Sequence, residues 1–286
     1  MAGMNTDDMP RQRGFSQVDV FTATALLGNP LAVVHDGTGL SDERMAAFAR
    51  WTNLSETTFL LPPTHPEADY RVRIFTPGGE LPFAGHPTLG SCHVWLKAGG
   101  QPKRADSLLQ ECTVGLVPLR RGDRLAFAAP PTTVERVDGE LLARVEAALG
   151  LAPADVRDAA WLSNGFPQLV LLLKDAATVR SLAPDHAALK SLGKVGVVGA
   201  HPAGAELDFE VRFFAAAIGI NEDPVTGSLN ANIARWLIDS GRAPVRYVAA
   251  QGAALGRAGR IHVTRDAQGT WIGGDVAACI EGTVTL

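Results

Sequence analysis

The 286-residue sequence has few cysteines and no long apolar run. Cys92, Cys112 and Cys279 are far apart and form no Cys-x-x-Cys pair, which argues against a disulfide framework and against a zinc knuckle. We expect all three to be small buried apolar residues. The strongest apolar run, 169–173, suits a buried strand and is too short to cross a bilayer, so no membrane partner is predicted.

An excess of basic charge is also missing. The sequence contains 26 Lys and Arg against 30 Asp and Glu, and its net charge of −4 excludes the basic footprint of a nucleic-acid-binding protein. Residues 1–14 are polar and lack the apolar region of a secretory signal, so we expect a disordered segment there and a cytoplasmic protein. The histidines other than His86 share no spacing suited to metal ligation, and no metal site is predicted.

One pattern occurs twice. Asp69–Phe75 and Asp208–Phe214 are similar strand patterns that lie 139 residues apart (208 minus 69), and each is followed by a loop with a polar residue, a proline and Gly-Ser. The offset is 137 at the Gly-Ser pairs (228 minus 91). A strand-loop-helix unit used twice predicts two lobes related by approximate two-fold symmetry.

We place the first lobe at residues 15–128 and the second at 129–286, with Ala129-Pro130-Pro131 as the hinge. The last strand is a candidate to cross back to the first lobe. With 46% apolar residues the chain has enough core for two domains.

The two loops are Gly85–Ser91 and Gly219–Ser228. Pro224 fits the first position of a helix, which puts Asp223 at or beside the N-cap, and we expect His86 to occupy the corresponding position in the first lobe. The free N–H groups of a first helical turn suit a carboxylate or similar anion.

The remaining pattern predicts helices and strands in a similar order in both lobes. Trp51, Trp95 and Trp236 are core candidates on helices. Helices are expected over 41–53, 89–98, 140–149, 185–191 and 229–240. Strands are expected over 17–21, 31–34, 55–61, 111–118, 124–128, 159–164, 168–173, 195–198, 247–250, 260–265, 270–272, 275–280 and 283–286.

Together these motifs resemble the PhzF family, the phenazine-biosynthesis-type proteins that are similar in fold to diaminopimelate epimerase. The resemblance covers almost everything after residue 14. Its motifs occur in the family's order, and they are Asp19-Val20-Phe21, Gly28-Asn29-Pro30, Asn53-Leu54-Ser55-Glu56-Thr57, Phe75-Thr76-Pro77, Leu81-Pro82-Phe83-Ala84-Gly85-His86-Pro87-Thr88 and Glu222-Asp223-Pro224-Val225-Thr226-Gly227-Ser228, with Gln251-Gly252, Gly256-Arg257 and Gly273-Gly274 as weaker support.

The resemblance implies an α+β fold of two pseudo-symmetric lobes, each a curved mixed sheet around a central helix, with the site in the cleft between them and a homodimer as the assembly. It implies an isomerase that acts on a small carboxylic acid without metal or organic cofactor. Glu56 matches the family's acid/base glutamate, and His86 and Asp223 match its polar partners. Gly227 and Ser228 match the loop that holds the substrate, and we add Gly85 and Thr88 of the first loop as candidates.

The chemistry of Glu56 is consistent with that role. Moving a C–H proton needs a base that can also act as an acid, and a carboxyl between apolar walls has its pKa raised toward the working pH. Without the resemblance, a solvated turn residue is the favoured interpretation of Glu56, because most glutamates lie on the surface. His86 reads as a loop histidine satisfied by the backbone, and Asp223 as an N-cap that contributes about 1 kcal/mol.

Three hypotheses stay open. The first is an isomerase that moves a proton within a cyclic or conjugated carboxylic acid through Glu56. The second is an amino-acid racemase or epimerase that uses Glu56 and another base, although the thiols of that chemistry are absent from the two loops, where His86 and Asp223 stand. The third is a catalytically silent protein that keeps the fold and binds a small molecule or a partner.

Overall fold

The chain divides into two compact units, and the computed structural model describes residues 10–286. Unit 1 is formed by residues 30–127 together with the segments before Leu27 and after Gly273. Unit 2 is formed by Leu27–Asn29 and Ala128–Gly273. Compared with the predicted lobes 15–128 and 129–286, the main boundary differs by one residue, and two short segments belong to the other unit.

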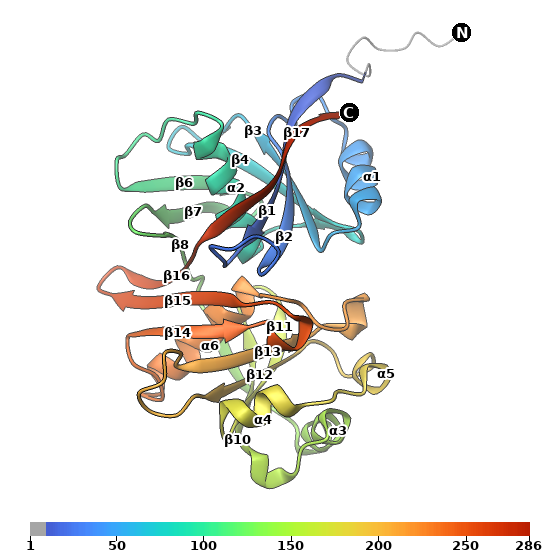
Figure 1. Ribbon diagram of the computed structural model, residues 1–286, viewed down its shortest axis with the longest axis vertical. Coiled ribbons are helices and arrows are strands. Elements are labelled where there is room, and N and C mark those ends of the chain that lie inside the picture. Colours follow the sequence, from blue (N-terminus) through green and yellow to red (C-terminus); the bar gives the residue numbers. More distant parts are fainter. Residues whose placement is uncertain (1–9) are drawn as a thin grey trace. The chain divides into compact units, whose positions relative to one another are not determined.

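Unit 1 contains a mixed sheet in the order β17-β1-β2-β3-β4-β6-β7-β8, with the short β5 added to β4. The last strand of the chain, red in Figure 1, lies antiparallel beside the first. These strands are β1 (Gln12–Val20), β2 (Asn29–Val34), β3 (Glu56–Leu61), β4 (Tyr70–Thr76), β5 (Gly79–Leu81), β6 (Ser107–Cys112), β7 (Gly115–Arg120), β8 (Leu125–Ala128) and β17 (Val276–Thr285).

Two helices cover the faces of this sheet. Helix α1 (Asp42–Thr52) begins at the N-cap Ser41, whose hydroxyl accepts from Arg44 N, and buries Met45 and Phe48 against Phe59 and Phe75. Helix α2 (Gly85–Lys97) packs against β1, β3 and β4 on the other face. Gly90 lets α2 approach closely, because a Cβ there would lie 2.5 Å from the side chain of Leu31.

Unit 2 contains a sheet in the order β9-β10-β11-β12-β13-β14-β15-β16. Its strands are β9 (Thr133–Arg136), β10 (Val156–Ser163), β11 (Pro167–Leu173), β12 (Val195–Ala200), β13 (Phe209–Phe214), β14 (Arg246–Gln251), β15 (Gly259–Asp266) and β16 (Gly269–Gly274).

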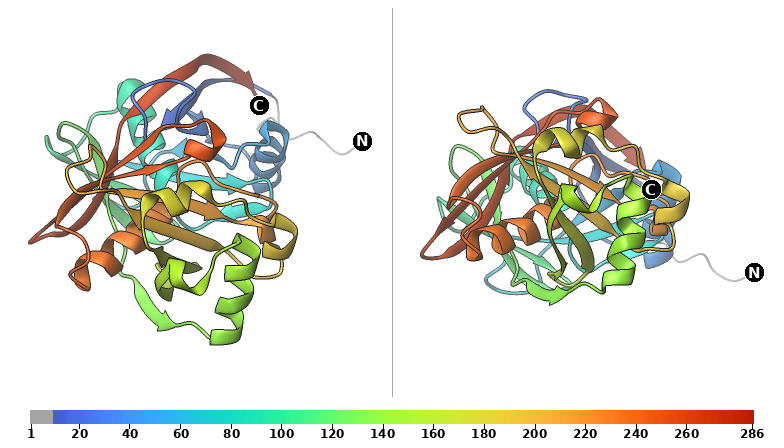
Figure 2. Two further views of the ribbon diagram at one scale, coloured as in Figure 1. Left: turned by 60° about the horizontal axis from the view of Figure 1, so that its bottom comes forward. Right: turned by 90° about the horizontal axis from the view of Figure 1, so that it is seen from below.

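The helices of unit 2 also lie on both faces of their sheet (Figures 1 and 2). Helices α3 (Gly139–Leu149), α4 (Ala176–Ser181) and α5 (His186–Leu189) enclose an apolar core with the side chains of β11 and β12. Helix α6 (Gly227–Asp239) covers the other face and buries a stripe of Leu229, Ile233, Trp236 and Leu237. Single 3-10 turns occur at Pro153–Asp155, Ala216–Ile218 and Ala253–Leu255.

The strand pairings repeat from unit 1 to unit 2. From β2 to β8 the neighbours are parallel, antiparallel, parallel, antiparallel and antiparallel, and from β11 to β16 the same series recurs. The central helix follows the third strand of each series, as α2 or α6. The predicted α+β class and duplicated arrangement are therefore confirmed.

Three local predictions were wrong. The predicted disordered segment 1–14 lies largely outside the described residues, but Gln12–Gly14 belong to β1 because they pair with Thr283–Thr285. The strand predicted over 111–118 contains the end of β6, a turn at 113–114 and the start of β7, whose first residue, Gly115, has a positive φ of 103°. Trp51 is 80% exposed and stacks on Phe48 from outside the core.

The core of unit 1 generates a stability prediction. Phe59 is fully buried and makes edge contacts with Phe48 and Phe75, so Phe59→Ala is expected to lower the free energy of unfolding by about 3–5 kcal/mol. Trp51→Ala, at the exposed edge of the same cluster, serves as the control and is expected to cost less than about 1 kcal/mol. Denaturant unfolding measures both, and equal losses would contradict the assigned core.

Candidate functional site

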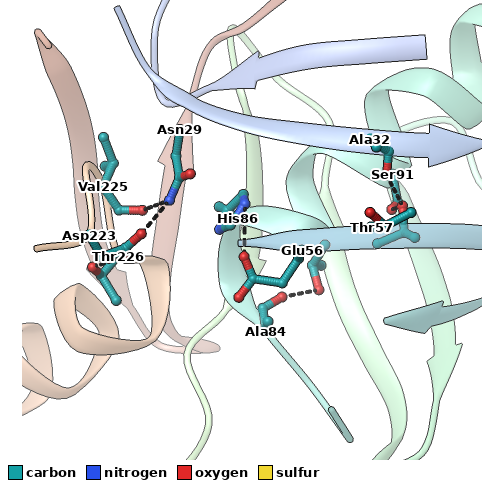
Figure 3. Close-up of polar contacts among 12 residues, drawn as sticks. Asn29, Ala32, Glu56, Thr57, Ala84, His86, Ser91, Asp223, Val225 and Thr226 are labelled. Carbon is teal, nitrogen blue, oxygen red and sulfur yellow. Dashed lines mark hydrogen bonds and ion pairs between the residues drawn. The ribbon is translucent and has the colours of Figure 1, made fainter. Parts of the chain in front are cut away.

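Glu56 and His86 lie together in unit 1. Glu56 is the first residue of β3, where Asn53 in the left-handed conformation ends α1 and turns the chain into the strand. His86 is the second residue of α2. The Glu56 Oε2 and His86 Nε2 atoms are 3.5 Å apart, and only 15% and 5% of the two side chains are exposed (Figure 3).

Burial changes the acidity of Glu56. Loss of water around the carboxyl raises its pKa from 4.5 to about 7, against the opposing effect of a hydrogen bond from Ser55. A carboxyl with this pKa exists in both protonation states near neutral pH, which is what a group that accepts and returns a proton requires. The interpretation of Glu56 as a solvated turn residue is therefore wrong.

A buried polar chain holds the start of α2. The N-cap is Ala84, which has no capping side chain, and the Thr88 hydroxyl donates to the Ala84 carbonyl at 2.9 Å. The Gln110 amide donates to that hydroxyl at 3.0 Å, and the Tyr70 hydroxyl donates to Gln110 Oε1 at 3.0 Å. Thr88 is fully buried, and its contacts support the helix start. Gly85, the first residue of α2, is also buried.

Asp223 lies in unit 2, in the loop before α6. Its Oδ1 accepts from Asn29 Nδ2 at 3.0 Å, and its Oδ2 accepts a short hydrogen bond from the Thr226 hydroxyl (Figure 3). The predicted N-cap position was wrong, because α6 begins at Gly227 with Thr226 as its N-cap. Pro224 consequently precedes the helix instead of opening it.

The side chain of Gln251, the last residue of β14, holds this loop in place. Gln251 is 1% exposed, and its Oε1 accepts from Thr226 N at 3.0 Å and from Asn230 Nδ2 at 2.9 Å. Its Nε2 donates to the Thr226 hydroxyl at 3.0 Å and to the Asp223 carbonyl at 3.1 Å. Because Gln251 donates to the Thr226 oxygen, the single hydroxyl hydrogen of Thr226 is available to Asp223.

Ser228 is the second residue of α6 and is partly buried. Asn164 donates to its carbonyl at 3.0 Å, and Gln168 Nε2 lies 3.4 Å from its hydroxyl. Asn232, one turn further along α6, donates to Gln168 Oε1 at 2.8 Å, which fixes the direction of the Gln168 amide. Gly227, the first helical residue, is buried.

The structure changes the correspondence between the two lobes. Helices α2 and α6 both have 13 residues, and their N-caps are Ala84 and Thr226. Aligning the helix starts pairs His86 with Ser228, so the predicted pairing of His86 with Asp223 was wrong. The partner shifts by five residues (228 minus 223) because the sequence echo of proline and Gly-Ser does not coincide with the helix starts.

The sequence did not predict the Asn and Gln side chains that form hydrogen bonds with the loop before α6 and with the starts of α2 and α6. Asn29 and Gln251 belong to the Gly-Asn-Pro and Gln-Gly motifs, so their motifs gave a signal but not a role. Gln110 and Gln168 stand in ordinary strand patterns, and their importance comes only from long-range contacts.

Between residues 10 and 286, no helix is long and apolar enough to span a membrane. The same part of the chain contains no group of three or more His, Cys, Asp and Glu side chains arranged to hold a metal ion.

Residues 18–282 match the model of the PhzC-PhzF family, described as phenazine biosynthesis-like protein. The chain belongs to this family. The match spans both units and includes most of β17. Because several relatives are also named as isomerases, the chain is an isomerase of the PhzF type.

Two curated relatives cover nearly the whole chain. Trans-2,3-dihydro-3-hydroxyanthranilate isomerase of Pseudomonas aeruginosa is 35% identical and aligns with 94% of this chain and 98% of its own. Antisense-enhancing sequence 1 of Schizosaccharomyces pombe is also 35% identical, over 95% and 98%. The crystal structure of a PhzF-family protein of Bacillus anthracis, 22% identical, matches the fold with a TM-score of 0.83 over 96% of this chain and all of the other.

The raised pKa of Glu56 predicts a pH-dependent stability. A folded-state pKa above the ordinary value contributes stability below pH 4.5 that is lost as the pH rises through about 7. Glu56→Gln removes this ionisation. We therefore expect the free energy of unfolding of the wild type to fall by about 3 kcal/mol relative to that of the variant when the pH is raised from about 4 to about 8. Denaturant unfolding at both pH values gives the difference, and a constant difference would contradict the burial of an ionisable Glu56.

The Gln251 contacts predict a second stability effect. Gln251→Glu has nearly the same shape but places acceptors against the Asp223 carbonyl and the Thr226 hydroxyl, and is expected to cost about 1–3 kcal/mol of unfolding free energy at neutral pH. Tyr247→Phe on the same strand is the control, because the Tyr247 hydroxyl has no hydrogen-bond partner among the described residues, and is expected to change stability by about 0.5 kcal/mol or less. Equal effects would show that the Gln251 amide does not hold the loop.

Proposed function

We propose that the protein isomerises a small cyclic or conjugated carboxylic acid by moving a proton from one carbon to another through Glu56. The observation that carries this proposal is the shielded Glu56 carboxyl beside His86, with a pKa of about 7. The Pseudomonas aeruginosa relative, whose name specifies a dihydro-hydroxyanthranilate as substrate, supports this substrate class.

The proton transfer balances within one carboxyl group. In its ionised form Glu56 takes a proton from a substrate carbon, and the electron pair of the broken C–H bond enters the conjugated system. The same carboxyl then donates the proton to another carbon, where a new C–H bond forms as the double bond shifts. Glu56 returns to its ionised form, so no net acid or base is consumed.

His86 is proposed to orient the Glu56 carboxyl and to stabilise its charge during the transfer. The distance of 3.5 Å in the free protein is long for a hydrogen bond, and such contacts shorten in substrate complexes of many enzymes. A fixed imidazole beside the carboxyl also limits the directions from which Glu56 can approach a carbon atom. His86 therefore contributes geometry as well as charge.

Asp223, Gly227 and Ser228 are proposed to serve the same reaction from unit 2. The first turn of α6 starts with glycine, and the Thr226 side chain donates to Asp223 instead of capping the helix. Helix-start N–H groups of this kind bind carboxylates, and the Ser228 hydroxyl adds a further polar contact. Asp223 is proposed to assist as a hydrogen-bond acceptor.

The family resemblance extends the proposal to assembly and setting. We propose a homodimer in the cytoplasm that works without metal or organic cofactor. Sedimentation of the purified protein measures whether it is a homodimer. Full activity after dialysis against a chelator is expected if the reaction needs no metal or organic cofactor.

Solvent exchange tests the central step. In deuterated water, wild-type protein is expected to introduce deuterium into trans-2,3-dihydro-3-hydroxyanthranilate as its double bond moves, and Glu56→Gln is expected to abolish this exchange while binding is nearly unchanged. NMR follows the label, and Glu43→Gln, an exposed residue of α1, is the matched control with unchanged exchange.

Exchange retained by Glu56→Gln would contradict the proposal. Deuterium at one stereocentre without movement of the double bond would identify a racemase or epimerase instead. Neither binding nor exchange with small carboxylates would favour a catalytically silent member of the fold.

A further inference from the structure

The strand registers of the two units reveal which residue of unit 2 occupies the place of Glu56. In unit 1, Thr57 of β3 lies opposite Phe75 of β4. In unit 2, Val195 of β12 lies opposite Phe214 of β13. Phe75 and Phe214 correspond in the repeated strand pattern, so Thr57 corresponds to Val195. The preceding residues, Glu56 and Lys194, then occupy equivalent positions.

The faces of the sheets agree with this assignment. Thr58 faces α2, where its hydroxyl accepts from Ser91 at 2.9 Å, and a Cβ on its counterpart Gly196 would lie 2.6 Å from the side chain of Leu229 in α6. Alternation along the strands therefore places Glu56 on the α2 side and Lys194 on the α6 side.

The neighbouring parallel strands give the same answer. Leu31 of β2 precedes the partner of Thr57, and Gln168 of β11 precedes the partner of Val195. Leu31 lies beneath Gly90 of α2, and Gln168 contacts Asn232 and Ser228 of α6. Three adjacent strands in each unit thus share one register.

Lys194 is a partly buried cation. Its ammonium lies 5.0 Å from the centre of the Phe166 ring, and burial lowers the pKa of the amine. Within residues 10–286 no carboxylate forms an ion pair with it, whereas Lys97 and Lys174 pair with Glu281 and Asp155. On the adjacent strand, Gln168 reaches the start of α6.

We propose that Lys194, together with the ring of Phe166, binds the carboxylate end of a planar substrate. This rests on the proposed function and names the group that unit 2 recognises. A partly desolvated cation without an anionic partner gains more from a bound carboxylate than a solvated one does. The ring beside it offers an apolar face to a flat molecule.

Binding of anthranilate, a planar carboxylate, tests this proposal. Calorimetric titration of Lys194→Met is expected to show anthranilate binding about 10- to 100-fold weaker than in wild type, the range for a lost hydrogen bond to a charged group. Lys194→Arg is expected to restore most of the affinity. Lys190→Met is the control, because Lys190 is exposed four residues earlier and its loss is expected to change nothing.

A neutral analogue separates charge from fold. Anthranilamide is expected to bind wild type and Lys194→Met equally, since it lacks the carboxylate. Equal anthranilate affinity in wild type and Lys194→Met would overturn the proposal, as would a wild type that binds no anthranilate. The proposed function is tested separately. It would be contradicted if Glu56→Gln retained deuterium exchange, whatever the affinity for anthranilate.

Discussion

The removal of water from one carboxyl group is the constraint on which the account depends. Glu56 begins β3 where the strand passes under the start of α2, and the apolar surroundings raise its pKa to about 7. The cost of holding a charge there is offset by the packing of α1 and α2 on the two faces of the unit 1 sheet. An exposed glutamate at the same place would be ionised at neutral pH, and it would be a poor general acid because it would carry no proton to donate.

In both units, buried glutamine side chains form hydrogen bonds with residues at the start of the central helix, although the contacts differ. In unit 1 Gln110 supports Thr88, and in unit 2 Gln168 and Gln251 reach Ser228 and Thr226. Neither N-cap uses its own side chain as a cap. Amide side chains suit this task because they donate and accept without bringing a charge. The polar ends of α2 and α6 are thereby held in fixed positions while their first turns stay uncapped.

Local patterns predicted much of this fold and the central residue of the candidate site. The repeat, the helix over 229–240 and the position of Glu56 near the start of a strand could all be predicted from the sequence. The helix start at Gly227 was not, because Pro224 offers a strong local signal that the contacts of Asn29 and Gln251 override. Lys194 was not among the predicted site residues, because its equivalence to Glu56 exists only in the strand register.

The central claim is that the Glu56 carboxyl exchanges its proton near neutral pH because it is shielded from water. Carbon-13 NMR of protein labelled at the glutamate side-chain carboxyl, with the Glu56 signal assigned by its loss in Glu56→Gln, measures that ionisation directly. The account predicts a titration centred at about pH 7. A signal that titrates near 4.5, as for a glutamate in water, would contradict it.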